Sequence, residues 1–416
     1  MKKIYWTRLI LFFAMLTGFG FLFNFAPKHE RTFSSDYWRY FYKDLPKNSM
    51  DVVFLGNSHS QCTFIPEIID SILDIHTINL YTPSENIHLA KSQYQEVLAN
   101  QNPQAVIIEA SSIFIGNDEI EKRPAQYSFY DSMPLSLKKV QTLFADLTIK
   151  ELANYYFPFI AMHTDWKTPA KQFKEFANAA ASKNTPVTLE NMGYTQRKDP
   201  LQEEELKKVD FDEFNTCPNP DLGSRLKTTE QVFKIDQGHP SQLVFIEAPT
   251  LTDKYRACVS STDELFQTYG KPYHRLFEDV KPAMLLYNDP DHLSQFGAII
   301  ASIETARILS DELGYAIDPQ VLAYYESYQF KDYTLVEDGN RLEFSLIPFD
   351  QAQLESLDFT WEVLVKGSPI HKETRRGGTI FVYEFKELPE KYMLRVTINN
   401  PAGDYELVGE FTFIEN

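Results

Sequence analysis

Short apolar runs alternate with helical patterns in the first half of the chain. The runs Asp51–Leu55, His76–Leu80 and Gln104–Ser111 are mostly aliphatic and are bounded by turn residues, as buried parallel strands are. Between them, helical patterns begin at Pro66, a favoured first-turn residue, and at about Glu85. This β-α-β-α-β succession with short connections predicts an α/β doubly wound sheet.

The same pattern resumes further along the chain. Apolar runs at Gln242–Pro249 and Ala283–Asn288 predict two more strands, with a helix around Ser261–Tyr269 between them. A helix from about Ser294 to Leu313 follows, because its apolar residues recur at helical spacing. We expect it to be the last element of the α/β domain.

The two groups of strands are separated by an irregular stretch, about residues 120–235. Its aromatic clusters and its charged run predict a helical insertion over one edge of the sheet, because charge runs of this kind are usually solvated helix faces. With this insertion, the α/β domain is expected to span residues 48–318.

The C-terminal part has a different texture, since apolar and polar residues alternate along it with a period of two. Turn residues separate the alternating runs, as at Asp338-Gly339 and Gly377-Gly378. This pattern predicts an antiparallel β-sandwich of about 85 residues, at 330–416. The runs are RLEFSLI, FTWEVLVKG, TIFVYEF, YMLRVTI and YELVGEFTFI.

The N-terminus carries an apolar run, Leu9–Phe23, that continues to Ala26 and is preceded by Lys2, Lys3 and Arg8. Its length approaches the ~20 residues of a spanning helix, and the basic flank predicts a cytoplasmic N-terminus. We therefore expect an uncleaved signal anchor at 1–27, followed by a linker or first helix at 28–47. The alternative is a signal peptide cleaved after Ala26, a poor context because Pro27 follows directly.

Composition restricts the class of protein further. The chain has 416 residues and a formal net charge of −18, which argues against non-specific nucleic-acid binding. Hydrophobic residues at 43% and charged residues at 24% exclude wholesale disorder. Three cysteines cannot form a disulfide framework or a four-cysteine zinc site. Cys62 is expected to be a buried apolar residue, and pairing of Cys217 with Cys258 is left open.

Two polar motifs lie at opposite ends of the α/β region. Gly56-Asn57-Ser58-His59 follows the first strand, and Asp289-Pro290-Asp291-His292 follows the last predicted one. Ligand sites in open parallel sheets form beyond the carboxyl ends of strands, where both motifs would lie. A serine nucleophile needs a base, and a histidine base needs a carboxylate that fixes its tautomer. Ser58, His292 and Asp289 can fill these three roles.

The same residues allow other assignments. Asp291 is the alternative orienting acid, with worse geometry because it adjoins His292. His59 adjoins Ser58, so we expect it to line the site rather than to act as the base. A metal site built from these His and Asp residues lacks a compact ligand spacing, so we expect no metal and no cofactor.

At these two motifs the chain resembles the SGNH, or GDSL-type, hydrolase superfamily. That family carries a Gly-Asp/Asn-Ser motif after its first strand and an Asp-x-x-His pair near the end of the domain, matched here at Gly56–Ser58 and Asp289–His292. The continuation to Ala298 also matches, and the resemblance covers about residues 48–315. Within the superfamily, the chain is most similar to membrane-anchored bacterial envelope proteins, relatives of the teichoic-acid D-alanine transfer protein and the alginate O-acetylation proteins.

The resemblance also implies an oxyanion hole, built from the serine amide, a glycine amide of a second block and an asparagine side chain of a third. No glycine occurs at Asn79–Glu85, where the second block should lie, so the Ser84 amide is the candidate. Asn117 is the candidate for the third donor, although it lies beyond the expected strand end. One lost donor typically costs ~10²–10³ in rate, so a slow or partner-dependent enzyme is expected.

The resemblance implies a serine esterase or O-acyltransferase that acts on acyl, chiefly acetyl, esters of a cell-envelope polysaccharide. Ser58 would attack the ester, His292 would move the proton, Asp289 would orient His292, and Asn57 and His59 would line the site. The implied partner is a membrane-bound O-acyltransferase, and the implied location is the bacterial cytoplasmic membrane with the bulk outside. The alternative is a catalytically inactive scaffold of a polysaccharide assembly complex.

Two further expectations concern the surroundings of the site. An acidic body is repelled by anionic polymers, which favours a neutral or amino-sugar substrate, or delivery by a partner. The C-terminal sandwich is expected to be a glycan-binding or spacing module, or else a structural lid on the α/β domain.

Overall fold

The computed structural model of the chain describes residues 35–115, 123–156, 190–201, 222–252, 256–278, 280, 283–387, 389 and 391–414. The chain divides into two compact units, which are described separately. The smaller unit comprises Met1–Pro46, Thr82–Ser84 and Asp118–Leu189, and the larger unit comprises Lys47–Tyr81, Glu85–Asn117 and Glu190–Asn416.

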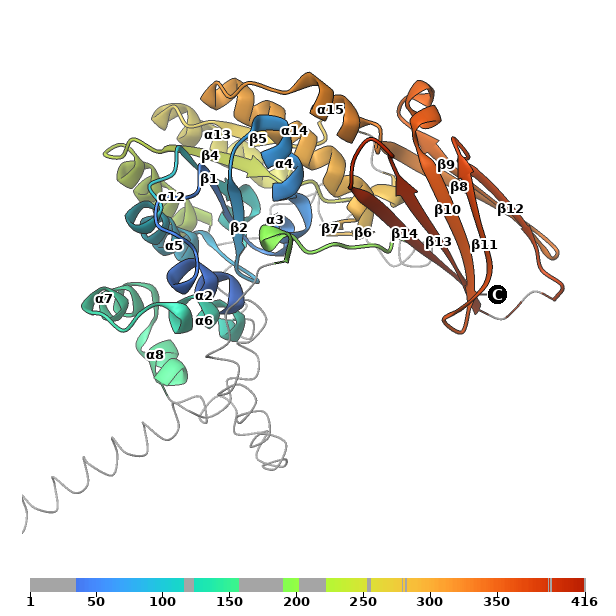
Figure 1. The fold of residues 1–416 in the computed structure, drawn as a ribbon. Coiled ribbons are helices and arrows are strands. Elements are labelled where there is room, and N and C mark those ends of the chain that lie inside the picture. The colour runs from blue at the N-terminus through green and yellow to red at the C-terminus, as the bar shows by residue number, and fades with distance from the viewer. Residues whose placement is uncertain are drawn as a thin grey trace, which may run out of the picture. The chain divides into compact units, whose positions relative to one another are not determined.

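A five-stranded parallel sheet organises the larger unit (Figure 1). Its strand order is β2-β1-β3-β4-β5, the order of one of the common doubly wound arrangements. The predicted α/β class and the first four strands are confirmed. The strands are β1 (Val52–Gly56), β2 (Thr77–Tyr81), β3 (Ala105–Glu109), β4 (Gln242–Glu247) and β5 (Tyr273–Arg275).

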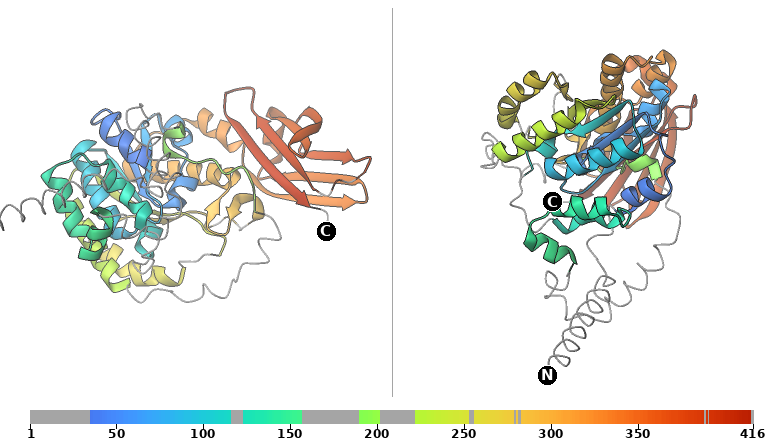
Figure 2. Two further views of the ribbon diagram at one scale, coloured as in Figure 1. Left: turned by 90° about the horizontal axis from the view of Figure 1, so that it is seen from below. Right: turned by 90° about the vertical axis from the view of Figure 1, so that its left-hand side faces the viewer.

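Helices cover both faces of this sheet, as Figure 2 shows from two further directions. Since alternate residues of a strand point to opposite faces, β4 shows which helices lie on which face. Val244 and Ile246 belong to the core that contains α4 and α14, whereas Phe245 packs against Phe233 of α12 and Phe266 of α13. The helices are α3 (Ser58–Thr63), α4 (Pro66–Leu73), α5 (Ile87–Asn100), α12 (Leu222–Asp236), α13 (Arg256–Tyr269), α14 (Gln295–Leu313) and α15 (Pro319–Glu326).

The strand predicted at Ala283–Asn288 is wrong. The fifth strand of the sheet is β5, and Met284–Leu286 form a 3-10 turn that leads into a short hairpin, β6 (Tyr287–Asp289) and β7 (His292–Leu293). The apolar run is buried although it is not a strand of the sheet, because it packs directly on α14. A Cβ on Gly297 would lie 2.1 Å from the carbonyl oxygen of Leu286, so only glycine permits this approach.

Two antiparallel sheets follow, and their orders are β11-β10-β13-β14 and β12-β9-β8. Their aromatic side chains meet between the sheets, as in the pairs Phe344–Phe411 (4.5 Å between ring centroids) and Trp361–Phe381 (5.4 Å). The predicted β-sandwich is therefore present. Its strands are β8 (Phe330–Asp338), β9 (Arg341–Pro348), β10 (Asp358–Val365), β11 (Ser368–Arg376), β12 (Ile380–Glu384), β13 (Lys391–Asn399) and β14 (Glu406–Ile414).

The smaller unit is helical over its described residues. Trp38 is fully buried, its ring contacts Phe129 at 4.7 Å, and its indole N–H donates to the Thr82 hydroxyl at 3.0 Å. Tyr155 contacts Tyr127 at 5.4 Å and thereby joins α8 to α6. The helices are α2 (Ser35–Lys43), α6 (Arg123–Ser132), α7 (Leu137–Asp146) and α8 (Ile149–Tyr156).

Two predictions reach beyond the described part of the chain. The apolar run at 9–26 lies outside the described residues, and none of the helices within them is long and apolar enough to cross a membrane. Cys258 is disulfide-bonded and Cys62 is a buried free thiol, whereas Cys217 lies outside the described residues.

Candidate active site

Ser58 opens α3 directly after the central strand β1. Asn57 caps this helix, because its side-chain oxygen accepts from the His59 amide at 2.8 Å. The chain leaves β1 for β2 on one side and then continues at β3 on the other, so the strand order reverses beside Ser58. The carboxyl end of a parallel sheet at such a reversal is where doubly wound proteins bind ligands.

Gly56 allows the turn between β1 and Ser58. A Cβ at this position would lie 2.6 Å from Cβ of Glu109 and 2.8 Å from Cβ of Ser60. Both distances are shorter than real carbon contacts, so the glycine of the Gly-Asn-Ser motif is required by the close approach of β1 to β3.

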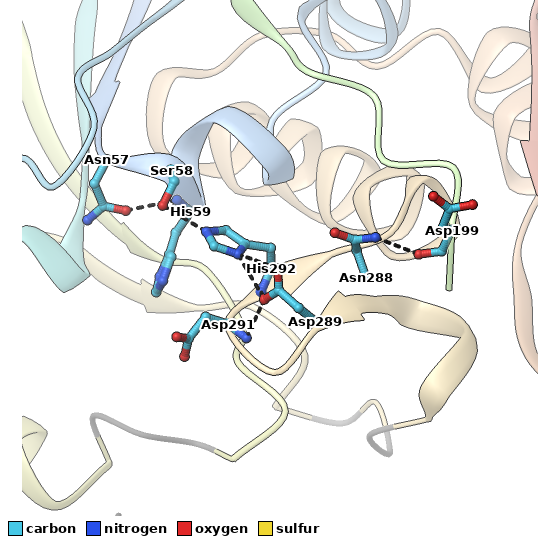
Figure 3. Close-up of polar contacts among 8 residues, drawn as sticks. All are labelled: Asn57, Ser58, His59, Asp199, Asn288, Asp289, Asp291 and His292. Atoms are coloured by element: carbon cyan, nitrogen blue, oxygen red, sulfur yellow. Dashed lines mark hydrogen bonds and ion pairs between the residues drawn. The ribbon is translucent and has the colours of Figure 1, made fainter. Parts of the chain in front are cut away.

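Ser58, His292 and Asp289 form a continuous hydrogen-bonded chain (Figure 3). The Nε2 atom of His292 lies 2.7 Å from the Ser58 hydroxyl, although the two residues are 234 positions apart. The Nδ1 atom of His292 lies 2.9 Å from each carboxylate oxygen of Asp289. With Asp289 ionised, Nδ1 carries the proton and Nε2 is left to accept one from serine.

The β6–β7 hairpin holds the Asp289–His292 pair. One oxygen of Asp289 also accepts from the backbone amides of Asp291 (2.9 Å) and His292 (3.0 Å). Partial burial by itself would raise the pKa of Asp289, but the hydrogen bond and charge of His292, with these two amides, hold the pKa below its usual value. Asp289 therefore stays ionised at neutral pH.

The alternative acid, Asp291, is placed differently. In Figure 3 the Asp291 carboxylate points away from His292, whereas that of Asp289 faces the ring. Its backbone amide donates to Asp289, so Asp291 helps to close the turn. The geometry thus favours Asp289 as the residue that orients His292.

The three side chains can be reached from solvent. The side chain of His292 is 20% exposed, that of Asp289 is 42% exposed, and Ser58 is half-buried. His59 lies behind them, since it is 6% exposed and its ring meets that of His292 edge-on at 5.4 Å. His59 therefore packs against the candidate base, in keeping with its expected place beside the site.

Asn57 is turned toward β3 and away from solvent. It is 1% exposed, and its amide nitrogen donates to the Ser111 hydroxyl at 2.8 Å and to Glu109 at 3.3 Å. Glu109 also accepts from the Ser111 hydroxyl and from the backbone amides of Ser111 (3.1 Å) and Ala248 (3.2 Å). Asn57 thus holds the turn that carries Ser58 against β3. Because its side chain is buried, it does not face the solvent-accessible side of the site, where its predicted contact with a substrate would lie.

Several carboxylates are buried around the contact between Asn57 and Glu109. Burial raises the pKa of Glu109 to about 7, and the charge of Glu247 acts in the same direction. Burial, followed by the charge of Glu109, raises the pKa of Glu85 well above its usual value. Glu247 itself accepts from the Tyr273 hydroxyl and lies 3.2 Å from Nε of Arg275. The carboxyl edge of the sheet thus holds acidic groups that the sequence motifs did not reveal.

A segment of the larger unit, residues 195–199, connects the elements of the site. The Thr195 amide donates to the Gln61 carbonyl at 3.1 Å, and the Gln295 amide donates to the Arg197 carbonyl at 2.8 Å. The Asn288 side chain donates to the Asp199 carbonyl at 2.7 Å, as Figure 3 shows. This segment thus joins α3, the hairpin and α14, although its own sequence carries no recognisable motif.

The structure does not test the two tentative oxyanion donors. Asn117 lies outside them. Ser84 has a left-handed backbone (φ 54°) and belongs to the smaller unit, whereas Ser58 belongs to the larger one. Both donors stay predictions. Among the described residues, no group of three or more His, Cys, Asp or Glu could hold a metal ion.

Comparisons with known proteins do not identify a family. No family model and no curated protein matches the chain. It is similar to the rat CD45 extracellular region, domains d3–d4, at 15% identity and a TM-score of 0.17, over 20% of this chain and 46% of that one. The chain thus spans about half the length of that structure.

Two further solved structures match over most of the chain. An engineered protein has 8% identity and a TM-score of 0.17, over 93% of this chain and 98% of that one. A double mutant of the Cellulomonas fimi endo-β-1,4-mannanase has 8% identity and a TM-score of 0.16, over 93% and 99%. Similarities this weak carry no argument about fold or function.

Proposed function

We propose that this chain is an SGNH-like serine esterase or O-acyltransferase. The observation that carries the proposal is the hydrogen-bonded chain from Ser58 through His292 to Asp289, at the carboxyl edge of a parallel sheet. Two sequence motifs separated by more than 200 residues supply these three groups in the order and geometry that a serine nucleophile requires.

The reaction follows from the direction of the hydrogen bonds. Ser58 Oγ attacks the acyl carbon while its proton passes to His292 Nε2, and Asp289 stabilises the imidazolium through Nδ1–H. His292 then returns the proton to the departing alcohol oxygen, which leaves an acyl group on Ser58. Water or a sugar hydroxyl then attacks the acyl carbon while its proton passes to His292. The bond from the acyl carbon to Ser58 Oγ breaks, His292 returns that proton to Oγ, and the serine is regenerated. Water gives ester hydrolysis, and a sugar hydroxyl gives acyl transfer.

The substrate proposal is a neutral or amino-sugar polymer of the cell envelope, carrying acetyl or related esters. The disulfide at Cys258 supports an extracytoplasmic location, because disulfides persist in oxidising compartments. The apolar run at 9–26 supports a membrane anchor with the bulk outside, and a membrane-bound O-acyltransferase is the proposed partner.

A second candidate is an inactive scaffold within a polysaccharide assembly complex. The observation that favours it is the lack of a glycine at Asn79–Glu85, where the resembling family supplies an oxyanion donor. Loss of that donor would leave the serine, histidine and aspartate in place without efficient catalysis.

A fluorophosphonate probe separates the two candidates. We expect the purified chain to form a covalent adduct on Ser58, identified by mass spectrometry, and to hydrolyse a small aryl acetate. Ser58→Ala and His292→Ala should each reduce both signals to background. Ser71→Ala, an exposed serine of α4, is the matched control and should keep them. If Ser58 stays unlabelled while a control esterase is modified, the scaffold candidate replaces the enzyme.

A further inference from the structure

Large apolar side chains lie exposed at one place in the smaller unit. Leu135 is 92% exposed, Leu137 74%, Phe144 66% and Ile149 87%. The other exposed large apolar residues among those described all belong to the sandwich. We call these four residues, which lie just before α7, on α7 and at the first position of α8, the α7 patch.

The patch has a consistent direction on α7. Leu137 and Phe144 are seven residues apart, which is two helical turns, so they share one side of the helix. Leu143, by contrast, is 1% exposed and turns into the unit. The helix therefore buries one apolar side, which carries Leu143, and exposes a second apolar side, which carries Leu137 and Phe144. The described residues leave this second side largely exposed.

Basic residues accompany the patch. Lys138 and Lys150 are exposed, and Lys139 donates to the Met133 carbonyl at 3.2 Å. Residues 131–151 also carry three carboxylates. Asp131 is half-buried, Asp146 accepts from the Tyr130 hydroxyl at 3.1 Å, and Glu151 is 6% exposed. The exposed charged side chains of this stretch are therefore the two lysines Lys138 and Lys150, since its carboxylates are half-buried or buried.

The patch belongs to the unit whose first described helix, α2, follows the proposed anchor in the sequence. The apolar run ends at Ala26 and α2 begins at Ser35, so an extended connection spans at most about 30 Å. α2 is packed on α6 through Trp38 and Phe129, and α7 follows α6 directly. An anchored chain would keep this unit within reach of the lipid headgroups.

We propose that the α7 patch is a second membrane contact, which inserts its apolar side chains among the headgroups of an anionic bilayer. Exposed Leu and Phe beside lysines form the combination that binds interfacial helices to such membranes. The inference rests on the anchor in the proposed function, but not on the chemistry of Ser58. Two attachments, one through the bilayer and one on its surface, would restrict rotation of the smaller unit about the anchor.

Photolabelling of the full chain tests this contact. The chain would be reconstituted in anionic vesicles containing a diazirine-bearing phospholipid, irradiated, digested and mapped by mass spectrometry. We expect lipid adducts on residues 135–149 as well as on 9–26, and none around Ile380, a sandwich residue of 52% exposure. The double substitution Leu137→Ser with Phe144→Ser should reduce adducts on α7 at least fivefold, while Ile380→Ser should not.

The remaining outcomes are decisive. Adducts confined to 9–26 would overturn the second contact and leave the anchor standing. Failure of the chain to float with vesicles, with no adducts at either place, would overturn both the contact and the anchor, while the Ser58 adduct is judged by its own probe. Equal labelling of α7 after the double substitution would also overturn the proposal, because both side chains are exposed and their loss does not disturb the fold.

Discussion

At the scale of single residues, Asp289 decides which proton His292 carries. Its carboxylate holds Nδ1–H, so that Nε2 faces Ser58 without a proton. In Asp289→Asn the amide NH₂ would favour the other tautomer, with the proton on Nε2 and no base for the serine. We expect hydrolysis to fall by roughly 10⁴-fold with little change in stability, as measured by aryl acetate turnover and thermal melting.

Asp291→Asn is the matched control for this substitution. Asp291 contributes its backbone amide to the turn, and that amide is unchanged by the substitution. We expect activity within about threefold of the unaltered chain, or roughly 0.6 kcal/mol. If Asp291→Asn were the more damaging of the two, Asp289 would not be the orienting acid.

Glu109 should make stability depend on pH. Its folded-state pKa, about 7, lies above the ordinary value of 4.5, so between these pH values the folded chain holds a proton that the unfolded chain has released. The free energy of unfolding contributed by this group therefore falls as pH rises from about 4.5 to 7.

Glu109→Gln tests this dependence. Glutamine keeps one acceptor oxygen and replaces the other by an NH₂ donor. Either the backbone amides of Ser111 and Ala248 or the side chains of Asn57 and Ser111 therefore lose their acceptor, and we expect a cost of about 1–3 kcal/mol at pH 5. The difference in the free energy of unfolding between the unaltered chain and the variant should be smaller at pH 8, because there the folded state of the unaltered chain is destabilised by ionisation of the buried Glu109. Urea unfolding at both pH values measures it, and a difference that widens with pH would contradict the assignment.

The sequence motifs contain the three candidate catalytic residues but not the residues that support them. Ser58, His292 and Asp289 stand in short motifs whose order and flanking residues are recognisable. Glu109 closes an ordinary aliphatic strand, and its contact with Asn57 depends on the register of β1 against β3, which the pattern of either strand leaves undefined. Support of this kind is a property of tertiary structure.

At the scale of elements, the contact of α14 with the turn at Met284–Leu286 depends on Gly297. A methyl group there would meet the Leu286 carbonyl oxygen at 2.1 Å, and both partners are backbone, so the elements must separate. We expect Gly297→Ala to cost about 1–3 kcal/mol or more, despite the better helix propensity of alanine.

Gly223→Ala is the control for this prediction. Gly223 lies in α12 and no atom lies within 4 Å of a Cβ built there, so the higher helix propensity should leave the chain unchanged or stabilise it by up to about 1 kcal/mol. Chemical denaturation of both variants gives the comparison. Equal effects would mean that the helix, and not the contact, sets the response at Gly297.

The elements that the sequence failed to predict share a physical reason. β5 (Tyr273–Arg275) and β11 (Ser368–Arg376) lie at sheet edges, where one neighbour suffices and the side chains stay largely accessible. Such strands need no apolar run and give no apolar signal. The run at Ala283–Asn288 gave the opposite error, because burial alone does not distinguish a strand from a turn packed on a helix.

At the scale of the whole larger unit, the sandwich and the α/β region share one core. A single buried cluster extends from Phe54 and Ile68 to Trp361 and Phe381. Gln295 of α14 joins the two regions, since its side chain accepts from the Val408 amide at 3.2 Å and donates to the Glu406 carbonyl at 3.3 Å. We therefore expect the unit to unfold in one cooperative transition.

Phe381→Ala, deep in the sandwich, tests this coupling. We expect a loss of about 3–5 kcal/mol, and a lower temperature at which Ser58 ceases to react with the fluorophosphonate. Ile380→Ser, on the neighbouring exposed residue, is the control and should change neither. Calorimetry supplies an independent measure. Two separate transitions, with Ser58 reactivity following only one of them, would show that the sandwich folds independently.

The hairpin that carries Asp289 and His292 makes the site insensitive to sequence inserted elsewhere in the chain. These two residues are three positions apart, so a local turn assembles the acid–base pair, and only the distance from Nε2 to the Ser58 oxygen has to be set across the fold. The entropic cost of closing the long loop between Ser58 and His292 grows slowly with its length. The packing of the sheet and of α14 offsets this cost, so that the site does not have to. A whole additional unit can therefore be inserted between β3 and α12 without changing the hydrogen bonds that join Asp289, His292 and Ser58.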